Sequence, residues 1–188
     1  MTKPRASLSR SDVRRDAVVD AAIVEFARTG YHGTPITNVA ATAGISSAYV
    51  FKLFPGKVAL FVAALERTFE QIERAMSTGA TRAGDDPEQL LWEMGGAYTE
   101  LIADKNLLMI QVHALSVADI PEVGEAMRNG LARVTGFVKR RSGAPDAEVQ
   151  RFIAWGQLCH LITTLQLDGN TNDWATIVTA GIRHPKPR

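Results

Sequence analysis

A single glycine between two short amphipathic segments is the feature that most constrains this chain. Residues 36–43 and 46–53 each have the length and apolar spacing of a two-turn helix, and Gly44 stands between them. Glycine adopts without strain the left-handed conformation that ends a helix and turns the chain. The apolar seam between the two segments would be formed by Val39, Ala43, Ile45, Val50 and Leu53.

This pattern predicts a helix-turn-helix, whose second helix has the size to enter the major groove of DNA. Ala40 is small enough to let the two helices approach closely, and Ser46 is suited to cap the second one. We also expect Gly30 to end the preceding helix. Thr34 is then the expected N-cap of the next helix, with Pro35 at its first helical position.

Apolar residues recur at helical spacing along the rest of the chain, and no alternating pattern is long enough to predict a strand. The fold class is therefore all-α, with about nine helices. The turn at Pro55-Gly56 separates a three-helix head, residues 1–56 with a basic arm at 1–11, from a helical body, residues 57–188. A polar break at 79–86 is a second candidate boundary. The expected helices cover 12–28, 34–43, 46–53, 57–77, 87–105, 106–118, 121–142, 146–167 and 172–182.

Charge is divided unevenly along a chain whose formal net charge is only +1. Residues 1–60 hold eight basic and four acidic side chains, whereas the remaining 128 residues hold 13 basic and 16 acidic ones. A basic head on a mildly acidic body suits a phosphate-binding surface, although basic N-terminal tails are also common in other proteins. No apolar run reaches membrane-spanning length, and Cys159 is the single cysteine. We expect a cytoplasmic protein without a membrane partner.

A set of residue types at fixed spacing runs through the head and into the start of the body: Ala21, Ala22, Phe26, Gly30, Tyr31, Thr34–Ile36, Val39, Ala40, Ala43–Ser46, Val50, Phe51, Phe54, Pro55 and Lys57. In these residues the chain resembles the TetR family of transcriptional regulators. That resemblance implies a homodimer in which each third helix reads one half-site of a near-palindromic double-stranded DNA operator. It further implies a body that binds a small apolar or amphipathic effector and releases the DNA.

The predicted DNA contacts lie at the start of the second helix, on the third helix and at two flanking basic residues. Lys57 is expected to meet a phosphate at the start of the fourth helix, and Tyr49 a thymine methyl group or a phosphate. A solvated lysine and a surface-packed tyrosine are the structural alternatives. The family usually has a tyrosine at Phe51, whose hydroxyl reaches a phosphate, so that one neutral hydrogen bond is lost here or is replaced by a contact of Lys52. The predicted contacts are Arg14, Thr34, Thr37, Ser47, Ala48, Tyr49, Phe51, Lys52 and Lys57.

In the body, the candidate ligand contacts combine apolar walls with a few polar groups, as small-molecule pockets do. They are Trp92, Met94, Tyr98, Met109, Gln111 and His113, with plain core packing as the alternative. The resemblance assigns the dimer interface to the last two helices, where the alternative is again intramolecular core. The interface residues predicted there are Trp155, Leu158, Cys159, Ile162, Leu165, Trp174, Ile177 and Val178.

Signatures of catalysis are missing from the sequence: it has no phosphate loop, no paired carboxylates in an apolar setting and no activated nucleophile. His113, Cys159 and His160 lack metal-ligand spacing, so we expect no metal and no cofactor. A sequence-specific regulator, most simply a ligand-released repressor, is the favoured interpretation, and a small all-α enzyme has no support. An activator, or a ligand-binding protein with weakened DNA binding, remains the alternative.

Overall fold

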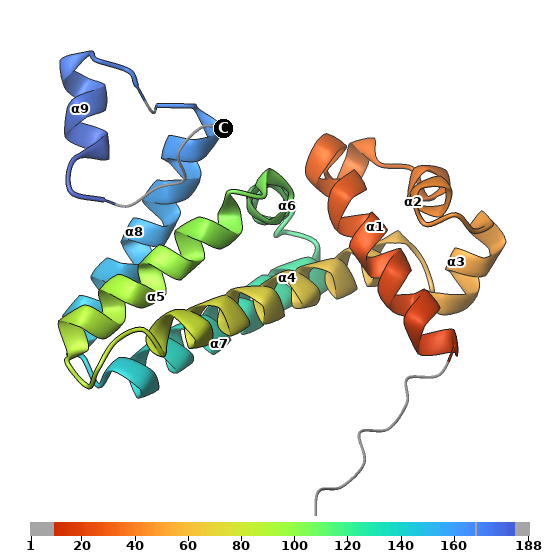
Figure 1. Ribbon diagram of the computed structural model, residues 1–188. Helices are drawn as coiled ribbons and strands as arrows, with labels where there is room; N and C mark the ends of the chain where they lie inside the picture. The colour runs from red at the N-terminus through yellow and green to blue at the C-terminus, as the bar shows by residue number, and fades with distance from the viewer. Residues whose placement is uncertain (1–9, 168, 183–188) are drawn as a thin grey trace, which may run out of the picture.

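The computed structural model describes residues 10–167 and 169–182, and within these residues the chain forms nine α-helices and no strand, as predicted. Helices α1, α2 and α3 form a group at one end, α4, α5, α7 and α8 run together toward the other end, and α6 lies between them (Figure 1). The helices are α1 (Arg10–Gly33), α2 (Ile36–Thr42), α3 (Ser47–Leu53), α4 (Lys57–Ala80), α5 (Pro87–Ile102), α6 (Lys105–Leu115), α7 (Pro121–Ser142), α8 (Asp146–Thr164) and α9 (Asp173–Thr179).

The turn between α2 and α3 follows the prediction closely. Gly44 has a φ of 67°, and its N–H donates to the carbonyl of Ala41 over 3.1 Å. The N–H of Ile45 donates to the carbonyl of Ala40 over 3.0 Å, so the two bonds together form a Schellman motif. Ser46 then caps α3 through a hydrogen bond from the N–H of Tyr49 to its hydroxyl. The helix-turn-helix is therefore closed by backbone geometry and one side-chain cap.

The corner between α1 and α2 differs from the prediction. Gly30 breaks the helical backbone inside α1, with φ 72° and ψ 178°, which confirms a helix end there. Thr34, however, does not cap α2: the N-cap position falls on Pro35, and no side chain caps that helix. The Thr34 side chain is fully buried, and its hydroxyl donates back toward the carbonyls of Gly30 and Glu25. Satisfying the orphan carbonyls at the end of α1 takes precedence over capping α2.

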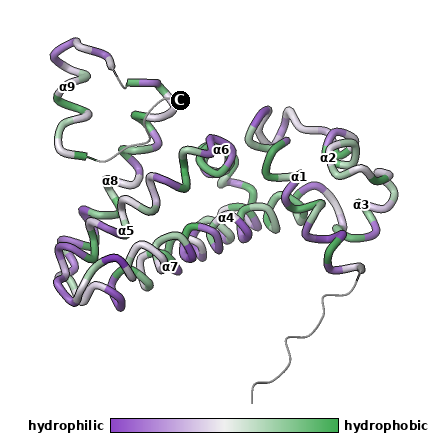
Figure 2. Tube along the Cα trace, viewed as in Figure 1, coloured by the Kyte–Doolittle hydropathy of each residue, from purple (hydrophilic) through white to green (hydrophobic). Residues whose placement is uncertain are grey.

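The apolar core of the head continues into the body. Buried residues of α1, α2 and α3 pack in one cluster with Leu60 and Phe61 of α4 and with Leu107 and Ile110 of α6. Figure 2 shows the alternation of apolar and polar residues along α4 and α7 that burial of one helix side produces. One apolar core thus extends across position 56/57, where the head was predicted to end. The division of the chain into head and body at that position stays a prediction.

Ion pairs add to this junction between α1 and α4. The Arg67 guanidinium of α4 pairs with Asp16 of α1 and, over 3.2 Å, with Asp20 one turn further along. The Arg67 side chain is about a quarter exposed and the two carboxylates are more open, so the network orients the helices more than it stabilises them.

The polar break at 79–86 is the turn of a helical hairpin and does not separate domains. Helices α4 and α5 pack along each other on either side of it, and Gly79 makes the close approach possible. A Cβ atom on Gly79 would lie 2.6 Å from the carbonyl oxygen of Glu93 and 2.7 Å from Cβ of Ala97. Asp86 caps α5 by accepting from the N–H of Gln89, as its position before Pro87 predicts.

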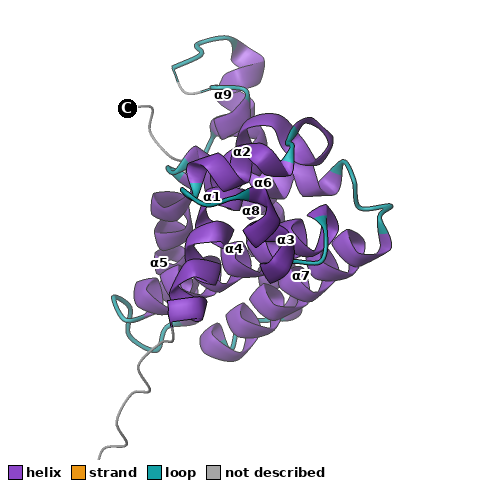
Figure 3. Cartoon of the chain, turned by 90° about the vertical axis from the view of Figure 1, so that its right-hand side faces the viewer, coloured by secondary structure: helices purple, strands orange, loops and turns teal. Residues whose placement is uncertain are grey.

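Helix α9 projects from the bundle beyond the end of α8 (Figures 1 and 3). Its Trp174 and Ile177 side chains are 53% and 76% exposed. Among the described residues, no single helix is long and apolar enough to cross a membrane, and α3 with α4 meets that test only as a pair bent by 69°.

The Gly130→Ala substitution should destabilise the protein. A Cβ atom at this position of α7 would overlap the ring of Phe69 on α4, which is buried. Overpacking costs about 1–3 kcal/mol and outweighs the gain of about 1 kcal/mol in helix propensity. Gly136→Ala on the same helix is the matched control, because the group it meets is the mobile end of Arg140. Urea unfolding should show a lower free energy of unfolding for Gly130→Ala only, and equal values for both variants would contradict the packing argument.

Candidate nucleic-acid interface and ligand cavity

Helix α3 presents its predicted DNA contacts on its outer side. Val50 is buried and points into the head, whereas Ala48, Phe51 and Lys52 are exposed and Ser47 and Tyr49 are half-buried. The Phe51 side chain is 54% exposed, an unusual position for a phenyl ring. The outer side of α3 thus combines one cation with two aromatic rings, which suits contact with phosphates and with thymine methyl groups.

Two arginines of α1 contact α3 and the residue that follows it. The guanidinium carbon of Arg14 lies 5.7 Å from the centre of the Tyr49 ring, within the range of a cation–π contact. The Arg15 guanidinium donates to the carbonyl of Leu53 over 2.8 Å and lies 4.2 Å above the ring of Phe54. Arg15 therefore occupies an orphan carbonyl at the end of α3, while Arg14 orients Tyr49 and remains exposed itself.

Lys57 lies at the first position of α4, as predicted, but it also has partners inside the head. Its ammonium donates to the carbonyl of His32 over 3.2 Å and lies 4.9 Å above the ring of Tyr31. Partial burial lowers the pKa of this lysine below its usual value. Thr37 on α2 is exposed, as a phosphate contact requires, whereas the burial of Thr34 excludes its hydroxyl from direct contact with DNA.

Glu25 is the organising polar residue of the head, and sequence analysis did not single it out. Its carboxylate is buried and accepts hydrogen bonds from Arg28 over 2.7 Å and from the hydroxyl of Thr42 over 2.8 Å. These hydrogen bonds lower its pKa, with Arg28 the largest contributor. Glu25 thereby joins α1 to the last residue of α2. The polarity of α1 at this position was the available signal, but a glutamate on an amphipathic helix is ordinarily solvated.

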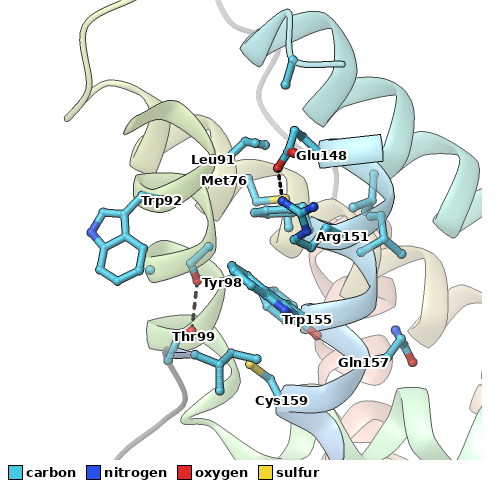
Figure 4. Close-up of a pocket in the computed structure, with 18 of the residues that line it drawn as sticks. Met76, Leu91, Trp92, Tyr98, Thr99, Glu148, Arg151, Trp155, Gln157 and Cys159 are labelled. Atoms are coloured by element: carbon cyan, nitrogen blue, oxygen red, sulfur yellow. Dashed lines mark hydrogen bonds and ion pairs between the residues drawn. The ribbon is translucent and has the colours of Figure 1, made fainter. Parts of the chain in front are cut away.

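The body contains a cavity of about 900 Å³ between α5 and α8, with α4 and α7 behind them. Its walls are mainly apolar and aromatic, which is typical of sites for small molecules. Figure 4 shows Glu148, Arg151, Trp155 and Cys159 following one another along α8. Trp92 lies at the outer edge on α5. The charged side chains of the lining lie near the N-terminal ends of two helices: Asp86 and Glu88 at α5, and Glu148 and Arg151 within the first six residues of α8.

A buried polar cluster lies further along α5 and α8. The Tyr98 hydroxyl is hydrogen-bonded to Nε2 of His160 and to Gln111. Burial lowers the pKa of His160 to about 4, raises that of Cys159 to about 11 and raises that of the Tyr98 phenol. All of these groups are consequently uncharged at neutral pH. His160 is thus a buried, hydrogen-bonded histidine within the subunit.

Three of the six predicted ligand residues line the cavity: Trp92, Tyr98 and Gln111. The other three lie elsewhere. Met94 is fully buried, Met109 packs against the core, and the His113 ring faces Gly30, where an added Cβ atom would lie 3.1 Å from its Nδ1. Helical periodicity does not distinguish a residue that faces a cavity from one that faces a neighbouring helix. The predicted ligand contacts also left out α4, α7 and all of α8, from which Trp155 and Cys159 had been assigned to the dimer interface.

The residues predicted for the dimer interface divide into three groups. Cys159 and Ile162 are buried within the subunit, and Trp155 and Cys159 line the cavity. Leu158 and Val178 are half-buried. Leu165, Trp174 and Ile177 are exposed, as is Trp155 at the cavity, and Leu161 of α8, which was not predicted, is 49% exposed. The structure thus leaves exposed apolar side chains on α8, just after it and on α9, and only part of the predicted stripe is among them.

Within residues 10–167 and 169–182, no group of histidine, cysteine or acidic side chains is arranged to hold a metal ion. The basic arm predicted at residues 1–11 lies almost wholly outside the described part of the chain.

Known proteins share sequence similarity with the head and with much of the body. Residues 18–64 match the family model described as bacterial regulatory proteins, tetR family. The HTH-type transcriptional repressor KstR of Mycolicibacterium smegmatis is 31% identical over 142 residues, which cover 75% of this chain and 69% of that protein. The match therefore extends well beyond the helix-turn-helix.

Solved structures share the fold. FadR from Bacillus subtilis in complex with stearoyl-CoA superposes with a TM-score of 0.67 at 16% identity, over 88% of this chain and 94% of that one. The multidrug binding protein EbrR complexed with imidazole gives a TM-score of 0.64 at 21% identity, over 99% of this chain and 100% of that one. At these identities the likeness concerns the fold alone.

Because the imidazole of His160 is buried, we predict that the protein loses stability in acid through this residue. The pKa of His160 is about 4 in the folded protein and 6.5 in the unfolded chain, so the unfolded state binds the proton first as the pH falls. Stability should drop between pH 6.5 and pH 4, with about 2 kcal/mol lost from pH 7.5 to pH 5 through this residue. Urea unfolding at the two pH values should show a smaller loss for His160→Gln. Equal losses in the two proteins would contradict a neutral, buried His160.

Proposed function

Because the chain belongs to the TetR family of DNA-binding transcriptional regulators, we propose that it is a repressor that an effector releases from its operator. It binds a near-palindromic operator as a homodimer, in the bacterial cytoplasm where the DNA lies. An apolar or amphipathic small molecule in the body cavity ends that binding. The proposal rests on one observation. The same chain has an outward-facing recognition helix and a large apolar cavity, and α6 packs on the head and also lines that cavity.

Base recognition is assigned to the outer side of α3. Tyr49 is held in place by the Arg14 contact and by the capped start of the helix, so it meets DNA with little loss of conformational freedom. Lys52 and Phe51 are exposed beside it. Phe51 has no donor for a phosphate, and its open phenyl ring suits an apolar contact with a thymine methyl group.

Phosphate contacts are assigned to Lys57, Thr37 and Arg14. Ser47 and Ala48 would lie close to the DNA backbone. Lys57 is the first residue of α4, so its ammonium and the free N–H groups at the start of that helix can attract the same anion. Thr34 contributes only by fixing the corner at which α2 begins, because its hydroxyl is used within the protein.

Dimerisation is assigned to the exposed apolar surface of α8 and α9. Four large apolar side chains are open to solvent there: Leu161, Leu165, Trp174 and Ile177. An apolar surface of this kind on a projecting helix is characteristic of a protein–protein contact. A second copy of the chain related by a two-fold axis would cover it and would present two recognition helices to two half-sites.

Signal transmission is assigned to α6, which is only 11 residues long. Gln111 lines the cavity and bonds Tyr98, and His113, two positions further on, packs against Gly30 in the head. A ligand that shifts α6 therefore acts directly on the corner at which α1 ends. The spacing between the two heads of the dimer changes, and the operator contacts are lost together.

Operator binding is the direct test. The protein should retard DNA from upstream of its own or the adjacent gene in a mobility-shift assay, and the shift should weaken with salt. Tyr49→Ala should change which sequences are preferred and should lower affinity for the best site about tenfold or more. Lys57→Ala should lower the affinity for all DNA sequences alike. It should also reduce the slope of log affinity against log salt by about 0.9.

Thermal unfolding of Lys57→Ala is the control, because its ammonium also bonds His32. If Tyr49→Ala kept the sequence preference of the wild-type protein, the proposed base contact would be wrong. If the wild-type protein gave no salt-sensitive shift with any such fragment, the proposed repressor function would be wrong.

Dimerisation is tested by placing a charge on the apolar surface. Ile177→Glu should convert the dimer to a monomer of 20.4 kDa and should weaken operator binding, because a buried unpaired carboxylate is costly. Val24→Glu is the matched control: Val24 is 40% exposed on α1, outside the proposed interface. Light scattering after size exclusion should report a dimer for wild type and control. A dimeric Ile177→Glu variant would place the interface elsewhere.

A further inference from the structure

Four polar side chains gather where α5, α6 and α8 meet the cavity: Tyr98, Gln111, Cys159 and His160. Each is less than a tenth exposed, and all but His160 line the cavity itself. We propose that this cluster, here called the neutral subsite, recognises an uncharged carbonyl or hydroxyl group on an otherwise apolar effector. The inference rests on the proposed function, since it takes the cavity to be the effector site.

The hydrogen bonds of the neutral subsite are incomplete. Gln111 donates to the carbonyl of Leu107 over 2.7 Å and is bonded to the Tyr98 hydroxyl, which is bonded to Nε2 of His160. The other imidazole nitrogen, Nδ1, is buried and has no partner in the protein. The hydroxyl of Thr163, one turn further along α8, is a second buried polar atom without one. Buried polar groups are nearly always satisfied, so these two open atoms show that the protein alone does not complete the hydrogen-bond network of the cluster. His160 and Thr163 do not line the cavity, so a ligand group would join this network through Tyr98, Gln111 and Cys159, which do.

The neutral subsite contains nothing that would compensate a charge on the ligand. Tyr98, Cys159 and His160 are uncharged at neutral pH for the reasons given above, and Gln111 carries no charge. Bringing an ionised carboxylate or ammonium into such surroundings is strongly unfavourable. A carbonyl oxygen can instead accept from the donors of the cluster, and a hydroxyl group can also donate.

The charged end of the cavity is separated from the neutral subsite along the helices. Eight residues of α8 separate Arg151 from Cys159, and ten residues of α5 separate Glu88 from Tyr98, which corresponds to about 12–15 Å. Phe152 and Trp155, which lie between Arg151 and Cys159 in the chain, add apolar surface to this part of the lining. The effector that fits this arrangement is elongated, with an apolar body and an uncharged oxygen at its inner end.

Three probes of matched chain length test the end-group chemistry: decan-2-one, decanoate and decylammonium. Binding to the full-length protein is followed by intrinsic fluorescence, since Trp155 lines the cavity, and by calorimetry. Decan-2-one should bind at least about tenfold more tightly than either ion. Tyr98→Phe and Gln111→Met should each lower its affinity, by an amount approaching tenfold for the loss of one hydrogen bond.

Arg74→Gln, an exposed position on α4 outside the cavity lining, is the control and should leave the affinity for decan-2-one within about twofold. The subsite is overturned if decanoate or decylammonium binds as tightly as the ketone, if neither subsite variant weakens it, or if no probe binds. None of these outcomes bears on operator binding without ligand, so failure of the repressor function would be seen separately in the mobility-shift assay.

Discussion

Helix α1 packs on two sides at once, and the arrangement of the whole molecule follows from this. One side carries α2 and α3, and the other meets α4 and α6, so a single apolar cluster holds residues of the head and of the body. Phe26 lies at the centre of that cluster, with its ring 4.7 Å from that of Phe61 in an edge-on contact. A displacement of α4 or α6 therefore cannot leave the orientation of the recognition helix unchanged.

Polar residues fix the direction of that packing. Glu25 joins α1 to α2, Arg67 joins α4 to α1, and Arg15 joins α1 to the end of α3. Apolar contacts alone are non-directional, and such polar links select one orientation from several of similar burial. The head thus presents α3 rigidly, which reduces the entropy lost on binding DNA.

The head was largely predictable from sequence because its signals are local. Gly44, Ser46 and Pro55 act on their own neighbourhood, and helix boundaries in the head follow from them. Thr34 was misassigned because its hydroxyl satisfies the carbonyls of Gly30 and Glu25 in the preceding helix, an arrangement that depends on how the chain bends at Gly30. The body was predictable only as helices. Whether Met94, Gln111 or Trp155 faces core, cavity or solvent depends on how α5, α6 and α8 are placed relative to one another.

The two residues of α6 that contact the cavity and the head have a thermodynamic consequence. Gln111 and His113 belong to one short helix, so in the proposed function effector and operator both act on the same element. Linkage then requires that any factor by which the effector weakens operator binding is also the factor by which the operator weakens effector binding. Protein bound to its operator should respond to the effector at higher concentrations than free protein does, and the bound and unbound molecules in one cell would have different thresholds.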